Sequence, residues 1–244
     1  MAFFRRILDF TPQSAAQTEK RHTSRYDLPL GSPIQCTLTQ GEAAWSCQIN
    51  NLSCTGANLL VKGKANLQPG DHVQVRFDWD EHYFSTPAKI VHTQTDRDIP
   101  AVGLAFTFSD FEARKTYLQL LEPISIGVGL SSQAQRVQAT EPGFETIRYH
   151  GIGQTLLTVW RHTEDGMLTG FEFRMNDYYV RNDLDRHILK IYVSARDHSA
   201  LDEGIELQRT DQASEEIKLL YRWVLAYLNP ELPADVRAML QAHQ

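Results

Sequence analysis

The sequence has few cysteines and lacks any long apolar run. Its three cysteines, Cys36, Cys47 and Cys54, form no CxxC pair, and no histidine pair stands near them at metal-ligand spacing. Neither a zinc site nor a disulfide framework is therefore suggested, and we expect reduced thiols, no metal and a cytoplasmic location. No cofactor is expected either. No stretch approaches the roughly 18 apolar residues of a membrane-spanning helix, and no transmembrane segment is predicted.

An excess of basic residues is also missing. The chain holds 24 lysines and arginines against 30 aspartates and glutamates, a formal net charge of −6. Because a general binder of nucleic acid needs a basic face that releases counterions, nucleic acid is not an expected partner. With 244 residues, of which 42% are hydrophobic, the chain can bury a core in each of two modest globular domains.

The first ten residues carry two arginines after a pair of phenylalanines and have no long apolar core, unlike a secretory signal. Two interpretations of this segment remain open: a short amphipathic helix that contacts a membrane or a partner, or a loosely packed terminus. The polar residues 11–20 that follow predict a mobile arm that becomes ordered when a ligand binds.

Two short motifs follow, an RxxxR formed by Arg21 and Arg25 and an NxSxxG formed by Asn51, Ser53 and Gly56. The guanidinium fork of arginine can form two parallel hydrogen bonds with O6 and N7 of guanine, or pair with a phosphate. Asn51 can accept from the guanine N1 and N2 donors, while Ser53 can donate to a phosphate oxygen or hold the turn. Gly56 is expected to supply a positive φ or a close approach of backbone to ligand. The simpler alternative is a solvated basic patch and a turn that enters a strand.

These five residues, in this order, resemble the PilZ family of bacterial receptors for the second messenger cyclic di-GMP. The likeness covers residues 15–122 and includes a first strand at 29–38, a turn at 68–71 before a strand at 72–77, and a late strand at 101–106. The resemblance implies an antiparallel β-barrel that binds cyclic di-GMP through the two motifs and is not an enzyme. It also implies a role in bacterial motility, polysaccharide synthesis or biofilm regulation.

The second half predicts strands by its valine, isoleucine, threonine and aromatic content, followed by two helices. The strands are expected at 143–148, 155–161, 168–175, 178–181 and 189–194, and the helices from Ser214 to Asn229 and over 234–241. We therefore expect a mainly β and α+β protein with four parts: a tail at 1–14, a PilZ-like barrel at 15–122 closed by a helix at 111–121, a linker at 123–140, and an α+β domain of unknown family at 141–244.

Catalysis in the second half has weak support. His150, His162, His187 and His198 lie among several aspartates, but no HxxxH, HExxH or GxSxG arrangement is present. The aromatic residues there indicate core packing first and a binding face second. The leading hypothesis is a non-enzymatic receptor that relays cyclic di-GMP binding to a protein partner through its C-terminal domain. The alternatives are a PilZ-like structural or interaction module that binds no nucleotide, and an enzyme in the second half under allosteric control.

Overall fold

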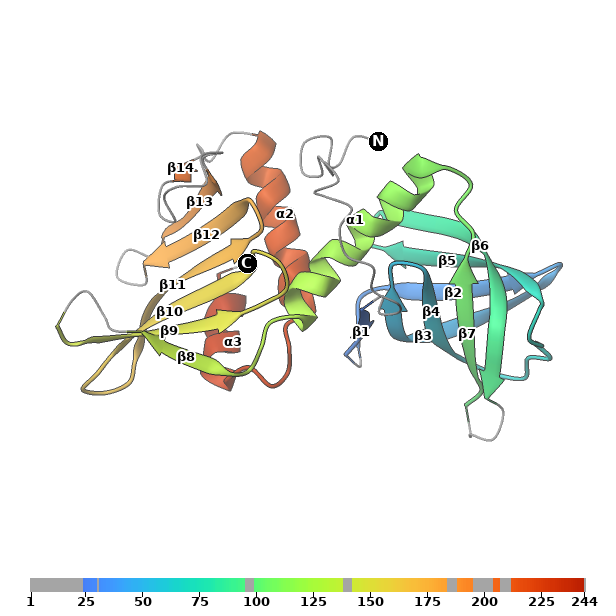
Figure 1. The fold of residues 1–244 in the computed structure, drawn as a ribbon, viewed down its shortest axis with the longest axis horizontal. Coiled ribbons are helices and arrows are strands. Elements are labelled where there is room, and N and C mark those ends of the chain that lie inside the picture. Colours follow the sequence, from blue (N-terminus) through green and yellow to red (C-terminus); the bar gives the residue numbers. More distant parts are fainter. Residues whose placement is uncertain are drawn as a thin grey trace, which may run out of the picture. The chain divides into compact units, whose positions relative to one another are not determined.

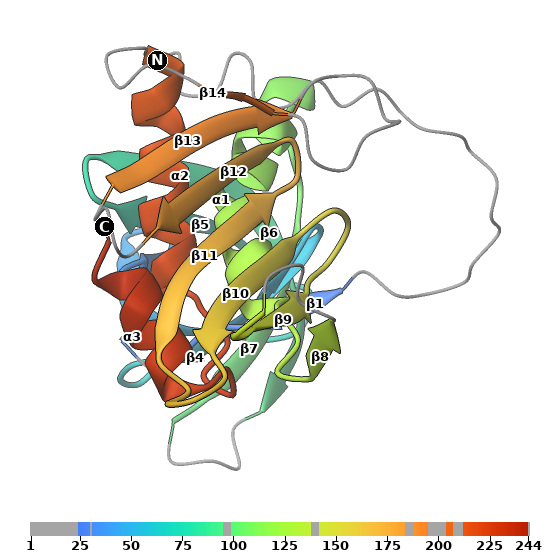
Figure 2. The same ribbon diagram turned by 90° about the vertical axis from the view of Figure 1, so that its left-hand side faces the viewer.

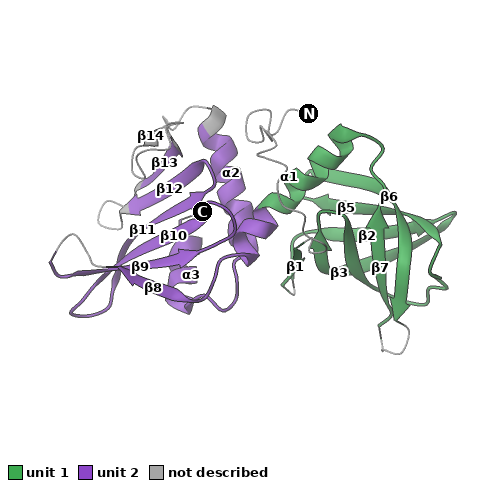
Figure 3. Cartoon of the chain, viewed as in Figure 1, with its two compact units in different colours: residues 1–122 green, residues 123–244 purple. Residues whose placement is uncertain are grey.

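The structure is a computed structural model that describes residues 24–29, 31–94, 99–137, 142–183, 188–194, 204–206 and 212–243. The predicted tail and arm, and Arg21 with them, lie outside the described residues. The chain divides into two compact units, residues 1–122 and 123–244 (Figure 3). No helix in the described segments has both the length and the apolar character needed to cross a bilayer.

The first unit is a closed antiparallel barrel (Figure 1). Its elements are β1 (Arg25–Asp27), β2 (Gln35–Gln40), β3 (Ala43–Ser53), β4 (Gly56–Val61), β5 (His72–Trp79), β6 (His82–Gln94), β7 (Ala101–Phe106) and the first part of α1 (Phe111–Val128). Six strands follow one another in the order β3, β2, β5, β6, β7 and β4, and β4 pairs back with β3 to close the ring. The short β1 pairs with the end of β3. The predicted antiparallel β-barrel is confirmed.

The barrel strands form because their apolar residues alternate, so that one face is buried and the other meets water. In β5, Val73, Val75 and Phe77 are buried while the residues between them are exposed. The predicted turn at 68–71 is present: the Gln68 N–H donates to Asp71 Oδ2 over 2.9 Å, and Gly70 adopts a φ of 101°. This turn positions the start of β5.

The predicted first strand at 29–38 is wrong at its start. The β2 strand begins at Gln35, and before it the Ser32 N–H donates to the Pro29 carbonyl over 3.2 Å, which marks a turn. Two prolines in this stretch lack the N–H that a strand ladder needs. Gly31, at a φ of 86°, completes the turn.

The predicted linker at 123–140 is also wrong, because its first residues are helical and residues 134–137 form a strand. Helix α1 starts where it was predicted, with the Ala113 N–H donating to Asp110 Oδ1 over 2.8 Å, but it continues to Val128. Ile124 and Ile126 are 0% and 3% exposed. Their burial shows that this stretch packs into a core, although its glycine-rich composition suggested a linker. A Cβ at Gly127 would lie 2.7 Å from the Val224 carbonyl oxygen, so this glycine allows close packing and does not mark a flexible joint.

The second unit is a seven-stranded antiparallel sheet with helices on one face. Its elements are β8 (Ala134–Val137), β9 (Phe144–His150), β10 (Leu156–His162), β11 (Leu168–Met175), β12 (Tyr178–Asp183), β13 (Ile188–Ser194), β14 (Gly204–Glu206), α2 (Gln212–Ala226) and α3 (Ala234–Gln241). Each strand pairs with its neighbour in sequence, from β8 at one edge to β14 at the other. Strands β12 and β13 cross in front of α2 in Figure 2. The expected α+β architecture of this half is confirmed.

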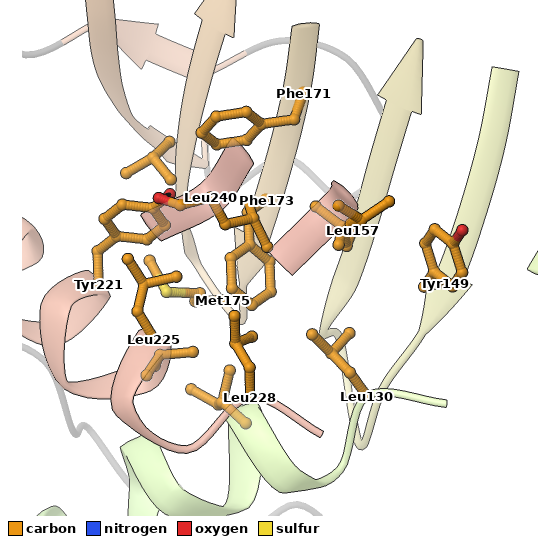
Figure 4. Packing of buried hydrophobic residues seen from close by; sticks show 14 of the residues in the cluster. Leu130, Tyr149, Leu157, Phe171, Phe173, Met175, Tyr221, Leu225, Leu228 and Leu240 are labelled. Atoms are coloured by element: carbon orange, nitrogen blue, oxygen red, sulfur yellow. Dashed lines mark hydrogen bonds between the residues drawn. The ribbon is translucent and has the colours of Figure 1, made fainter. Parts of the chain in front are cut away.

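The core of the second unit lies between the sheet and its helices (Figure 4). Phe171, Phe173 and Met175 of β11 are fully buried, and Tyr221 of α2 reaches toward them. The Tyr221 hydroxyl donates to the Leu240 carbonyl over 3.0 Å and so ties α2 to α3. Burial raises the pKa of Tyr221.

Candidate functional site

The pairing of β1 with β3 brings part of the RxxxR motif to the NxSxxG motif. Arg25 lies directly opposite Ser53, and Asp27 lies opposite Asn51. Residues directly opposite in an antiparallel pair project their side chains from the same face. Arg25 is exposed, Asn51 half-buried and Ser53 buried. Four of the five predicted site residues, all but Arg21, therefore fall on adjoining strands.

A β-bulge in β3 places Asn51 and Ser53 on the outside of the barrel. Ile49 points inward and is 5% exposed, so strict alternation would send both motif residues into the core. The register instead shifts between Ile49 and Asn51, with Asn50 as the extra residue. Leu52, at 0% exposure, then takes the inward position. Bulges re-aim side chains in this way, often next to functional sites.

The Ser53 hydroxyl holds the turn between β3 and β4. It donates to the Gly56 carbonyl over 3.2 Å and accepts from the Thr55 N–H at 3.4 Å. Of the two roles considered for Ser53, contact with a phosphate oxygen and stabilisation of the turn, the geometry shows the second. Both bonds are local, so the turn is shaped before any ligand arrives.

Gly56 is required by a close approach between strands. Its φ is not positive, and a Cβ at this position would overlap the carbonyl oxygen of Leu104 in β7, with the Leu104 carbonyl carbon 3.2 Å away. The Phe106 N–H also donates to the Thr55 carbonyl over 2.9 Å. The expectation of a positive φ is wrong, and the close approach is to the β7 backbone.

Tyr117 of α1 anchors the motif from inside the barrel, a role that the sequence did not reveal. Its hydroxyl donates to the Ser53 carbonyl over 2.7 Å, and its ring is fully buried between Phe84 and Phe106, with ring centroids 5.5 Å and 5.0 Å away. Burial raises the pKa of Tyr117 well above its usual value. A tyrosine on an otherwise apolar helical face was the available signal.

Small and amide side chains form the outer surface beside the motif. Next to Ser53 the cross-strand row continues through Gly56 to Ala105, and next to Asn51 it continues through Asn58 to Gly103. Asn50 Nδ2 donates to Asn58 Oδ1 over 3.1 Å. Both glycines are buried and Ala105 is half-buried, while the amides supply donors and acceptors on this outer surface.

The cysteines are free thiols. Cys36 and Cys47 are directly opposite one another in β2 and β3, facing the barrel interior. A hydrogen bond with Cys47, together with burial, raises the pKa of the Cys36 thiol. Cys54 is half-buried in the β3–β4 turn.

The two described histidines of the four named from the sequence, His150 and His162, have separate partners. His150 Nε2 lies 2.8 Å from Gln135 Oε1, whereas the His162 ring lies 4.7 Å from the Phe144 ring. His187 and His198 lie outside the described residues. Within the described segments, no three histidine, cysteine, aspartate or glutamate side chains gather closely enough to hold a metal ion.

Comparison with known proteins gives one family. A sequence model described as the PilZ domain matches residues 19–122, and no family model matches the C-terminal half. No curated protein matches the chain.

Several solved structures are similar to this chain in part. The PilZ domain of YcgR from Escherichia coli, solved with c-di-GMP, is 16% identical, with 42% of this chain and 88% of that one covered at a TM-score of 0.36. The PilZ domain of CeSA from a cellulose-synthesizing bacterium is 17% identical, with 42% and 94% covered at a TM-score of 0.30. An uncharacterized Legionella protein is 13% identical, with 41% and 90% covered at a TM-score of 0.28.

The family match spans all the strands of the closed barrel, the NxSxxG turn and both arginines of the RxxxR motif. Residues 19–122 of this chain form a PilZ domain.

Proposed function

We propose that the chain is a non-enzymatic bacterial receptor for cyclic di-GMP. The PilZ domain binds the dinucleotide through Arg21, Arg25, Asn51, Ser53 and Gly56, and the second unit relays the event to a protein partner. PilZ domains are in general receptors for this second messenger. We place the protein in the cytoplasm and its output in motility or biofilm regulation as parts of the same proposal.

The observation that carries the proposal is the register of β1 on β3, with Arg25 opposite Ser53. An exposed guanidinium beside a preformed turn can pair with a phosphodiester or with the O6 and N7 edge of guanine. Asn51, turned outward by the bulge, stands on the same face and can hydrogen-bond the guanine edge. In this arrangement Ser53 and Gly56 shape the site, while Arg25 and Asn51 contact the ligand.

A second candidate is a PilZ structural or interaction module that binds no nucleotide. It is favoured by the intramolecular roles of two motif residues, because Ser53 bonds within its turn and Gly56 permits contact with β7. The fold would need both residues for those roles even if the protein bound no ligand. The two candidates differ in what they predict for Arg25, whose exposed side chain is not needed for the barrel core.

Titration calorimetry of the full chain with cyclic di-GMP separates them. Arg25→Ala is expected to weaken binding by roughly 2–4 kcal/mol, because it removes a charge-assisted contact and leaves a ligand acceptor unpaired. The matched control is Arg76→Ala, which removes an exposed arginine that pairs with Asp78 on β5, and it should bind like wild type. Absence of binding by the wild-type chain supports the second candidate.

The relay is tested separately by hydrogen exchange. A ligand biases an element only if its affinity differs between the states of that element. If the second unit transmits the signal, adding cyclic di-GMP should change amide exchange in α2 or α3. If amide exchange over residues 212–243 is unchanged at saturating cyclic di-GMP, the proposed relay is wrong, whereas the receptor assignment still stands.

A further inference from the structure

A second β-bulge in the barrel faces the same outer surface as the first. In β6, Ile90 points inward and is 0% exposed, so strict alternation would send His92 into the core. The register shifts between Ile90 and His92, with Val91 as the extra residue. Both Val91 and His92 are exposed as a result. Two bulges, at Asn50 and Val91, therefore turn polar residues outward on strands that flank the same pair, β4 and β7.

The outward-facing residues lie in one cross-strand row. Asn51 is opposite Asn58, Asn58 is opposite Gly103, and Gly103 is opposite His92. Because neighbouring strands are about 4.8 Å apart, Gly103 lies roughly 10 Å from Asn51 across the barrel surface. The row thus joins the NxSxxG motif to His92 without leaving the outer face.

The His92 ring lies over Gly103. A Cβ built on Gly103 would overlap the imidazole: Nε2 would lie 2.6 Å away, and Cε1 and Nδ1 would lie nearer still. The ring therefore occupies the space that a side chain at position 103 would need. This brings an exposed aromatic plane back across β7, toward Asn58 and the motif.

We propose that the His92 imidazole stacks on a purine base of the bound dinucleotide. This inference rests on the proposed function. A cyclic dinucleotide carries two purines on one closed ring, so a base held at Arg25 and Asn51 leaves the second within reach of the neighbouring strands. Histidine is one of the aromatic side chains on which nucleic-acid bases stack. Gly103 positions the ring, and the small residues beside it leave room for the base.

Calorimetric titration with cyclic di-GMP of the full-length His92→Ala and His92→Phe variants tests this. Loss of the ring should weaken binding about tenfold, whereas phenylalanine, which keeps an aromatic plane and removes the ring nitrogens, should stay within about threefold of wild type. His82→Ala is the matched control, since His82 lies ten positions earlier in β6 against Trp79, and it should not change affinity. Equal weakening by alanine and phenylalanine would overturn stacking.

Gly103→Ala tests the positioning of the ring. The added methyl group displaces the imidazole and should weaken binding in the wild-type background, but it should cost little more in His92→Ala. The same loss in both backgrounds would overturn the role of Gly103. If wild type binds and His92→Ala binds equally well, the stacking inference alone fails. If wild type does not bind cyclic di-GMP, the proposed function fails and the inference with it.

Discussion

Replacing Tyr117 by phenylalanine isolates the bond that ties α1 to the candidate site. The tyrosine ring is fully buried and its hydroxyl donates to the Ser53 carbonyl over 2.7 Å. Phenylalanine fills the same volume, so no large cavity forms and the aromatic cluster stays packed. The loss is one buried hydrogen bond and a less satisfied carbonyl, which costs about 1–2 kcal/mol of unfolding free energy.

The same substitution has a pH signature. The pKa of Tyr117 is raised in the folded protein by burial, whereas an unfolded tyrosine ionises near pH 10. The unfolded state therefore loses this proton first, and wild type loses stability above pH 10 at up to about 1.4 kcal/mol per pH unit from this group. Tyr117→Phe lacks the group, so its deficit at pH 8 should shrink above pH 10 and vanish near pH 11.

Urea unfolding of the full chain, followed by fluorescence, measures both effects. Carrying Trp160→Phe and Trp223→Phe in both proteins leaves Trp45 and Trp79 of the barrel as reporters. A Tyr117→Phe protein as stable as its parent at pH 8 would refute the anchoring role. A stability gap that stays constant through pH 11 would refute the assignment of the buried hydroxyl as the titrating group.

Four further outcomes are expected. Arg25→Lys should lose most of the affinity lost by Arg25→Ala if this residue binds the guanine edge, since an ammonium lacks the planar fork; calorimetry that shows near-wild-type affinity would restrict it to phosphate contact. Gly56→Ala should destabilise the barrel by about 1–3 kcal/mol in urea unfolding, because its Cβ meets the Leu104 carbonyl. Gly127→Ala should lower the thermal stability of the second unit by a similar amount through its contact with Val224, and an unchanged melting temperature would contradict the close packing. Tyr221→Phe should reduce the loss of stability above pH 10, because burial raises the pKa of Tyr221; an unaltered alkaline profile would argue against its burial.

The sequence predicted the barrel and the meeting of its motifs because both have local signals. Alternating apolar residues and the Gln68–Asp71 turn identify the strands. The resemblance to a family predicts that Arg25 and the NxSxxG turn contribute to one ligand site. The bulges at Asn50 and Val91 had no such signal, since one extra residue in a strand leaves its composition unchanged. The outward orientation of Asn51 and His92 thus became visible only with the strand register.

The linker prediction was wrong because composition does not separate flexibility from close packing. Gly127 suggested a joint, but it lies where a Cβ would meet the backbone near the end of α2. The apolar side chains of Ile124 and Ile126 argued against a linker, and their burial shows that this segment is part of a packed core. The role of Tyr117 was hidden for another reason: its partner, Ser53, is 64 residues away in sequence. Contacts over that separation depend on the complete fold.

The most direct test of the central claim is an amide NMR titration of the full-length protein with cyclic di-GMP. The account predicts saturable shifts at residues 25–27, 51–58 and 103–105, which form adjoining strands on one outer face of the barrel. The β5–β6 hairpin around Trp79 and His82 should not respond. Shifts confined to the second unit, or no shifts at millimolar dinucleotide, would contradict the assignment of this surface as a cyclic di-GMP site.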